Sequence, residues 1–193
     1  MPRMTNFRAF IIVSVLMLAP SPAAAQDTAS LWAALAGGGH VALMRHALAP
    51  GIGDPAEFQI NDCATQRNLN DEGRAQARRT GDAFRRNGVV VGRLLSSEWC
   101  RCLETAALMK LAKVESFAGL NSFFEGQYDE DDQTRAVRDL VSRLDPKGRS
   151  LVMVTHQVNI SALTGGGAQS GAIVVLKLGG PGGFEVRGTI PPQ

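Results

Sequence analysis

Several features that mark large classes of proteins are missing from this chain of 193 residues. It has no dense tract of lysine and arginine, which is the usual signature of a nucleic-acid partner. Its clearest apolar run, residues 9–19, is about half as long as the ~20 residues of a membrane-spanning helix. We therefore expect no nucleic-acid partner and no stable membrane span in the mature protein.

Signatures of bound cofactors and metal ions are missing as well. None of the glycine clusters is followed by Lys-Ser or Lys-Thr, so the chain lacks the phosphate loop of nucleoside triphosphate sites. Cys100 and Cys102 are separated by one residue rather than by the two of a zinc site, and no histidine pair lies at ligand spacing. We expect neither a cofactor nor a metal ion.

The first 25 residues have the organisation of a secretory signal peptide. Arg3 and Arg8 make a positive start, the apolar run follows, and residues 23–25 are all alanine, as in a small-residue cleavage site. Cleavage there leaves residues 26–193, the length of a single domain, in an exported protein that is periplasmic or secreted. Removing Arg3 and Arg8 also lowers the 20 basic residues to the number of acidic ones, 18.

Export would place the three cysteines in an oxidising compartment, where one disulfide and one remaining thiol are expected. Cys63 pairs with either Cys100 or Cys102, because both of these segments are expected near Arg45. The sequence does not choose between the two pairings.

Helical and strand patterns alternate along the mature chain, and no internal repeat is present. Helices are predicted over residues 28–36, 71–86, 98–110, 131–144 and 159–163. Strands are predicted over residues 40–44, 89–96, 150–155, 172–178 and 184–188, the last two as a hairpin. The helix 71–86 is the best marked, because Asn70 can cap it and Gly88 follows it.

This alternation predicts an α/β fold, a three-layer α/β/α arrangement around a mostly parallel central sheet. Residues 150–155 form a continuous apolar run, which is typical of a strand buried on both faces of such a sheet. In these sheets the functional site lies at the carboxyl ends of the strands.

Two strand ends carry residues suited to phosphoryl transfer. Arg45 and His46 follow the strand 40–44, and His156 follows the strand 150–155. Two histidines beside a permanent cation at one sheet edge suit phosphoryl transfer to a nitrogen nucleophile. His40 is the first residue of the strand 40–44, and we interpret it as a structural hydrogen-bonding residue.

Four segments, in order, resemble motifs of the histidine phosphatase superfamily, which includes phosphoglycerate mutases and many acid phosphatases. The segment Arg45-His46 resembles the family's Arg-His-Gly signature, with Ala47 in place of the glycine. Residues 67–77 resemble the family's stretch after the nucleophile, and residues 96–106 resemble its Ser-x-x-x-Arg-x-x-x-Thr-Ala motif. His156 matches the second histidine. The resemblance spans residues 41–163 and implies a phosphoglycerate mutase-like fold and a small, exported member of the branch-1 type.

By this resemblance His46 is the nucleophile, and Arg45, Arg101 and His156 bind the transferred phosphoryl group. The chemistry supports these roles, because a neutral imidazole attacks phosphorus without a separate base. Planar guanidinium groups hold the equatorial oxygens of the transition state in bidentate fashion. Arg67 is a further candidate for substrate binding.

Hydrolysis also needs a group that protonates the leaving oxygen and then activates water. Glu125 is the first choice, because two aromatic residues precede it and would desolvate it and raise its pKa. Asp129 is the second choice. One branch of the family has an aspartate directly after the second histidine, but this chain has Gln157 there.

The sequence therefore predicts an exported phosphomonoesterase of the histidine acid phosphatase type, with a phosphohistidine intermediate on His46. Its substrate would be a small-molecule or envelope-linked phosphate ester, for which sugar phosphates of the cell envelope are suggested by the compartment. Mutase activity is a weaker alternative, because export separates the protein from glycolytic intermediates. The non-enzymatic alternative is a phosphate-binding or envelope interaction module with the same pocket but little turnover. The sequence contains no feature from which an oligomeric state can be predicted.

Overall fold

The computed structural model describes residues 1–193 with the exception of 1–21 and 180–182. The positive start and apolar run of the expected leader lie outside the described residues, so cleavage and export stay predictions. Among the helices that are described, none combines the length and the apolar character that crossing a membrane requires.

The centre of the molecule is a six-stranded sheet in the order β3-β2-β4-β1-β5-β6. The strands are β1 (His40–Arg45), β2 (Val91–Ser96), β3 (Val114–Ser116), β4 (Ser150–Thr155), β5 (Ile173–Leu178) and β6 (Phe184–Ile190). The pairs β2–β3, β2–β4 and β1–β4 are parallel, whereas β5 runs antiparallel to both β1 and β6. The predicted mostly parallel sheet is confirmed, with the antiparallel strands at one edge.

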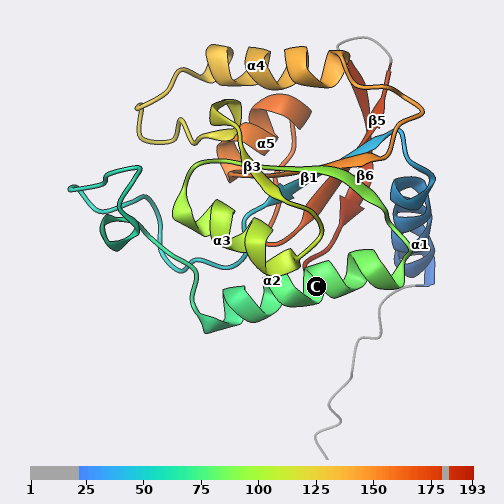
Figure 1. The fold of residues 1–193 in the computed structure, drawn as a ribbon, viewed down its shortest axis with the longest axis horizontal. Coiled ribbons are helices and arrows are strands. Elements are labelled where there is room, and N and C mark those ends of the chain that lie inside the picture. The colour runs from blue at the N-terminus through green and yellow to red at the C-terminus, as the bar shows by residue number, and fades with distance from the viewer. Residues whose placement is uncertain (1–21, 180–182) are drawn as a thin grey trace, which may run out of the picture.

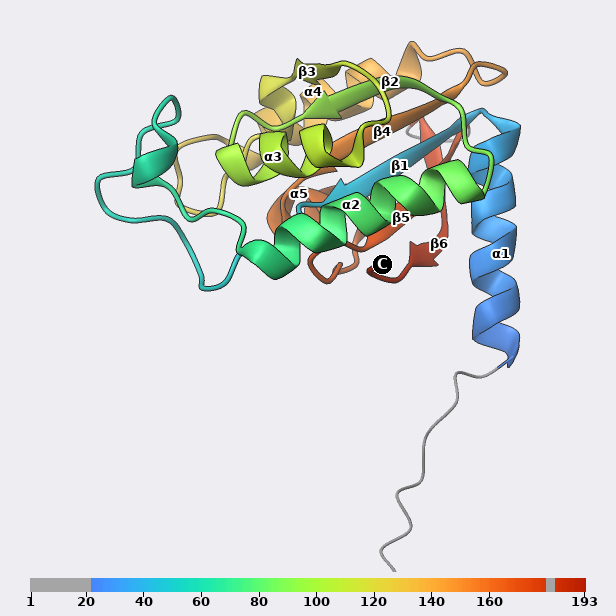
Figure 2. The same cartoon turned by 60° about the horizontal axis from the view of Figure 1, so that its bottom comes forward.

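Helices cover both faces of this sheet (Figure 1). They are α1 (Pro22–Gly37), α2 (Asp71–Arg86), α3 (Cys100–Met109), α4 (Glu130–Ser142) and α5 (Gln157–Thr164), with short 3₁₀ turns η1 (Cys63–Thr65) and η2 (Ala118–Leu120). The helices α1, α2 and α3 lie on one side, and α4 and α5 lie on the other, as Figure 2 also shows. The three-layer α/β/α prediction is confirmed.

The period-2 geometry of β1 explains the two cores. Ala42 and Met44 pack into the cluster under α1, α2 and α3, whereas Val41 and Leu43 pack into the cluster under α4 and α5. The strand β4 is buried along its whole length, as its continuous apolar pattern predicts.

Most element bounds agree with the sequence prediction. The helix α2 and the strand β4 have the predicted bounds, and Asn70 caps α2 by accepting a hydrogen bond from the Gly73 N–H. The strand β3 was not predicted, because three residues are too few to show a period. It forms because it pairs with β2.

The sheet brings the two predicted histidine segments to one edge. The neighbouring strands β1 and β4 are parallel, and Arg45 is opposite Thr155 in their register. The chain therefore places His46 and His156 at corresponding positions just beyond the strands, and the His46 N–H donates to the Thr155 carbonyl at 2.9 Å.

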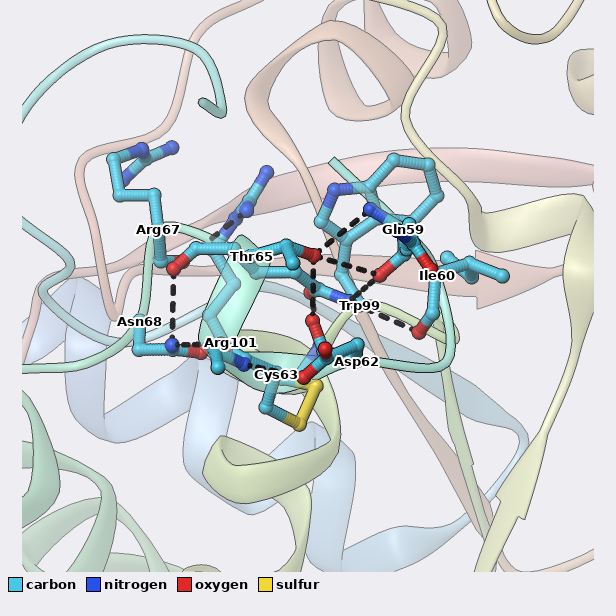
Figure 3. The surroundings of a disulfide bond; sticks show 12 residues. Gln59, Ile60, Asp62, Cys63, Thr65, Arg67, Asn68, Trp99 and Arg101 are labelled. Atoms are coloured by element: carbon cyan, nitrogen blue, oxygen red, sulfur yellow. Dashed lines mark hydrogen bonds between the residues drawn. A yellow bond between two sulfur atoms is a disulfide. The ribbon is translucent and has the colours of Figure 1, made fainter. Parts of the chain in front are cut away.

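A disulfide joins Cys63 to Cys100, with their Cα atoms 5.7 Å apart (Figure 3). It attaches the long loop after β1 to the first turn of α3. The sequence left two pairings open, and the structure selects this one. Cys102 is a buried free thiol that donates to the Thr155 carbonyl.

Candidate active site

A cavity of about 190 Å³ opens at the carboxyl edge of the sheet. Six of the predicted site residues line it, namely Arg45, His46, Arg67, Arg101, Glu125 and His156, whereas Asp129, the second choice of acid, is not in the lining. The floor comes from the ends of β1 and β4 and from α3. The loop after β1 and the segment between η2 and α4 form the mouth.

His46 is buried, and its environment selects one ring nitrogen for chemistry. Its Nδ1 lies 2.8 Å from the Ala47 carbonyl, which can only accept, so Nδ1 carries the hydrogen and Nε2 keeps the lone pair. Burial and the nearby Arg101 charge lower the pKa of His46 to about 3. The imidazole is therefore neutral at pH 7 and needs no separate base to act as a nucleophile.

Thr105 supports the backbone beside His46, a role that the sequence did not predict. Its Oγ1 accepts a hydrogen bond from the Ala47 N–H at 3.0 Å. Ala47 does not have a positive φ, so the change from the family's glycine introduces no backbone strain.

His156 is fixed in the opposite orientation. Its Nε2 lies 2.9 Å from Ser97 Oγ, and Ser97 in turn donates to Asn121 Oδ1. Nε2 therefore donates, and Nδ1 accepts from Arg101 Nη2 at 3.4 Å. Burial, followed by the Arg101 charge, holds the pKa of His156 well below its usual value of 6.5. The two histidine rings have centroids 5.5 Å apart.

The two arginines leave donors without partners. Arg101 is buried, and Arg45 is partly buried and donates Nη1 to the Ala168 carbonyl at 3.0 Å. Among the residues that the structure describes, Arg45 Nε and Arg101 Nε are buried and lack a hydrogen-bond partner. Burial and the Arg101 charge also lower the pKa of Arg45. Both arginines line the cavity, so an anion there would pair with their guanidinium groups and relieve the repulsion between the two cations.

Asp54 is a site residue that the sequence analysis missed. Its side chain is only 3% exposed and accepts from Arg101 Nη1 at 2.8 Å, from Trp99 Nε1 at 2.9 Å and from the Arg67 N–H at 2.9 Å. Burial favours its neutral form, but the hydrogen bonds from Arg101 and Arg67 hold its pKa below the usual value. Asp54 is therefore an ionised partner of Arg101 and poorly suited to donate a proton.

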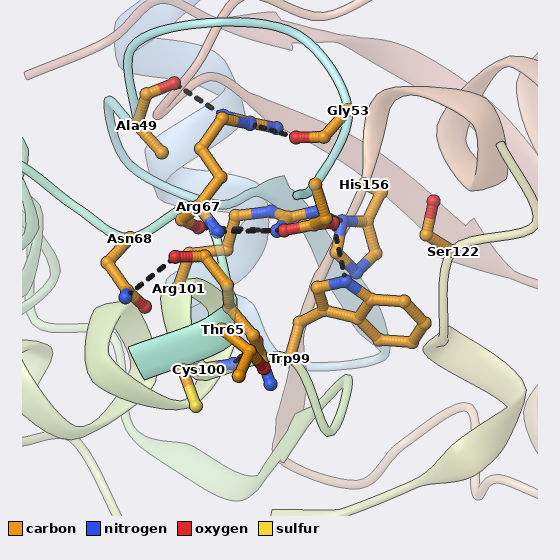
Figure 4. Close-up of polar contacts among 12 residues, drawn as sticks. Ala49, Gly53, Thr65, Arg67, Asn68, Trp99, Cys100, Arg101, Ser122 and His156 are labelled. Carbon is orange, nitrogen blue, oxygen red and sulfur yellow. Dashed lines mark hydrogen bonds and ion pairs between the residues drawn. The ribbon is translucent and has the colours of Figure 1, made fainter. Parts of the chain in front are cut away.

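Arg67 reaches the site through the loop rather than through the helix that follows it. Its Nε donates to the Gly53 carbonyl at 2.7 Å, and its Nη1 donates to the Ala49 carbonyl (Figure 4). Arg67 lies in the cavity lining, and its role in substrate binding stays a prediction. Arg74 and Arg79 instead pair with carboxylates on the surface of the domain.

Glu125 lines the cavity, but its surroundings differ from those predicted. The side chain is exposed, and Phe124 is 58% exposed, so the aromatic pair does not enclose the carboxyl group. The prediction that these rings desolvate Glu125 is wrong. Its Oε1 instead accepts from the Asp54 N–H at 2.8 Å. Asp129, the second choice, caps α4 by accepting from the Asp132 N–H.

We expect acid to destabilise the fold through the two histidines. Unfolded histidine binds a proton near its usual pKa of 6.5, whereas burial lowers the pKa of folded His46 to about 3. Between these values the unfolded chain binds more protons than the folded one. The free energy of unfolding therefore decreases as the pH is lowered, by up to roughly 1.4 kcal/mol per pH unit for each histidine. Urea denaturation between pH 7.5 and 4.5 measures this slope. It should be shallower in His46→Gln, and an equal slope would contradict the prediction.

The chain thus combines a three-layer α/β/α fold with a cavity at the sheet edge that is lined by arginines and by two buried histidines. The profile described as histidine phosphatase superfamily (branch 1) matches residues 41–143. The chain belongs to this superfamily. A comparison with curated proteins gave no significant match.

Solved structures share the fold. The protein histidine phosphatase SixA complexed with tungstate superposes with a TM-score of 0.58 at 18% identity, over 79% of this chain and 97% of that one. YhfR from Bacillus stearothermophilus superposes with a TM-score of 0.56 at 17% identity, over 76% of this chain and 94% of that one. A phosphoserine phosphatase variant from Entamoeba histolytica in complex with phosphoserine superposes with a TM-score of 0.57 at 12% identity, over 78% of this chain and 95% of that one.

Proposed function

We propose that this protein is an exported phosphomonoesterase that hydrolyses phosphate monoesters through a phosphohistidine on His46. The observation that carries the proposal is that a neutral His46, with its lone pair on Nε2, lines one cavity together with Arg45 and Arg101. A phosphoryl group between them would meet a nucleophile and two fixed cations at once.

The reaction has two steps. In the first, His46 Nε2 attacks phosphorus, the bond from phosphorus to the ester oxygen breaks, and Glu125 gives that oxygen a proton. In the second, water attacks phosphorus, Glu125 takes a proton from the water, and the bond to Nε2 breaks to release inorganic phosphate. Arg45, Arg101 and His156 hold the phosphoryl oxygens in both steps, and Arg67 contacts the substrate from the loop.

The proposed role of Glu125 has a measurable consequence. In Glu125→Gln we expect kcat for an alkyl phosphate to fall about 10²-fold, because an alkoxide leaves poorly without a proton. The loss should be smaller for p-nitrophenyl phosphate, since nitrophenolate leaves without help. The matched control is Glu130→Gln, an exposed carboxylate in the first turn of α4. Equal losses for the two esters would remove Glu125 from the acid role.

The compartment is part of the proposal. The charge pattern and apolar run of the leader support export, and the Cys63–Cys100 disulfide fits an oxidising environment. By compartment alone, sugar phosphates of the cell envelope are the first natural esters to consider.

A generic phosphatase assay tests the proposal. We expect continuous release of inorganic phosphate from p-nitrophenyl phosphate, with vanadate as a competitive inhibitor. The cavity alone would also suit a phosphate-binding module, because the positive charges of Arg45 and Arg101 would attract an anion whether or not turnover follows. Binding of vanadate without hydrolysis of any ester would favour that second function.

A further inference from the structure

Two loops meet at the mouth of the cavity, and each exposes one large apolar side chain there. The Asp54 N–H donates to Glu125 Oε1 at 2.8 Å and so joins the loop after β1 to the segment before α4. Ile52, two residues before this contact, is 90% exposed, and Phe124, one residue before Glu125, is 58% exposed. Both line the cavity. Figures 1 and 2 show the two loops at the same end of the molecule.

The backbone holds Ile52 in this exposed position. Gly51 and Gly53 on either side of it have φ values of 96° and 68°, which favour glycine. A Cβ on Gly53 would lie 2.5 Å from Glu125 Oε1, so a larger residue there would displace this carboxylate from its contact with the Asp54 N–H. The exposure of Ile52 is therefore a product of a defined turn rather than of a free chain end.

The size of the cavity means that a substrate must touch this rim. A volume of about 190 Å³ is smaller than the ~300–1,000 Å³ of typical small-molecule sites. The cationic floor takes the phosphoryl group. The remainder of any larger ester then passes between Ile52 and Phe124.

Polar side chains near the rim are already engaged with the protein. Gln157 Oε1 accepts from the Ala168 N–H, and Gln157 Nε2 donates to Ser161 Oγ. The two carboxylate oxygens of Glu125 accept from the Asp54 N–H and from Gln127. These contacts take up part of the hydrogen-bonding capacity of Gln157 and Glu125, whereas the exposed apolar side chains gain by covering an apolar group of the ester.

We propose that Ile52 and Phe124 form an apolar rim that selects phosphate monoesters with an alkyl or aryl leaving group. The proposal rests on the phosphatase function proposed above and names its substrate class. It favours apolar esters over the sugar phosphates that the compartment alone suggests.

Hexyl phosphate and glycerol 3-phosphate test this rim, because both are esters of primary alcohols and differ mainly in the polarity of the leaving group. We expect wild-type kcat/KM to be about tenfold higher for hexyl phosphate. In the double variant Ile52→Ser, Phe124→Ser, this preference should disappear, chiefly through a higher KM for hexyl phosphate. The matched controls are Val90→Ser and Val186→Ser, which are also exposed but lie outside the cavity lining and should keep the preference.

Several results would contradict the proposed role of the rim in substrate selection. In the ester assay these are equal wild-type kcat/KM for the two esters, a preference for glycerol 3-phosphate, or an equal fall in kcat/KM for both esters in the double variant. If sedimentation shows a wild-type dimer that the double variant loses, the rim is a subunit interface instead. If no ester is hydrolysed, the proposed phosphatase function is wrong, but the proposed apolar rim is not yet tested. Calorimetry then tests the rim by comparing the binding of hexylphosphonate and methylphosphonate. Tighter wild-type binding of hexylphosphonate, lost in the double variant, supports it, and equal binding overturns it.

Discussion

Replacing His46 with alanine should abolish phosphatase turnover while the protein stays folded. The covalent route disappears with Nε2, and no second histidine in the described site presents a free lone pair, because His156 Nδ1 accepts from Arg101 and Nε2 donates to Ser97. We expect kcat to fall by at least about 10³-fold, as for the loss of other covalent nucleophiles. Steady-state assays with p-nitrophenyl phosphate measure the loss, and circular dichroism checks the fold.

The chain offers a matched control for this variant. His40 lies at the opposite end of β1 and uses Nδ1 to contact the Gly38 carbonyl, so His40→Ala removes an imidazole from the same strand without touching the cavity. It should retain turnover. Rapid quenching without acid, followed by mass spectrometry, should place a phosphoryl group on His46 in the wild type. Near-native activity in His46→Ala would end the assignment of the nucleophile.

The second large effect is expected from Arg101→Lys. Arg101 contacts two side chains at once, since Nη1 binds Asp54 and Nη2 contacts His156, while its buried Nε has no hydrogen-bond partner. A lysine keeps the charge but cannot hold a phosphoryl oxygen while it maintains the other two contacts. We expect kcat/KM to fall by about 10²–10³-fold, the usual cost of losing one preorganised donor. Competitive inhibition by vanadate should weaken in parallel.

Arg93→Lys controls for a loss of guanidinium geometry elsewhere. Arg93 makes a comparable pair with Glu115 at 2.7 Å, but this pair is exposed and lies outside the cavity lining. Its replacement should leave kcat/KM unchanged, because exposed pairs contribute little. Retention of wild-type kcat/KM and vanadate affinity in Arg101→Lys would contradict phosphoryl binding by this side chain.

The regular elements and the floor of the site were predictable because both depend on short-range patterns. The helix α2 has a cap, a charged first turn and a helical period, and β4 is apolar on both faces. His46 and His156 stand directly after β1 and β4, so the rule that sites gather at the carboxyl ends of parallel strands places them together. Arg101 followed from the resemblance, since no local pattern distinguishes it from other arginines of the chain.

The sequence by itself therefore determined the layered fold and the strand-end positions of the two histidines. Only the tertiary structure decided the pairing of Cys63 with Cys100, the ion pair between Asp54 and Arg101, and the exposure of Glu125. The physical reason is that strands and helices repeat at fixed periods that the chain displays, whereas loops do not. Each loop contact joins residues far apart in sequence, and it forms only after the sheet has brought those segments to one edge.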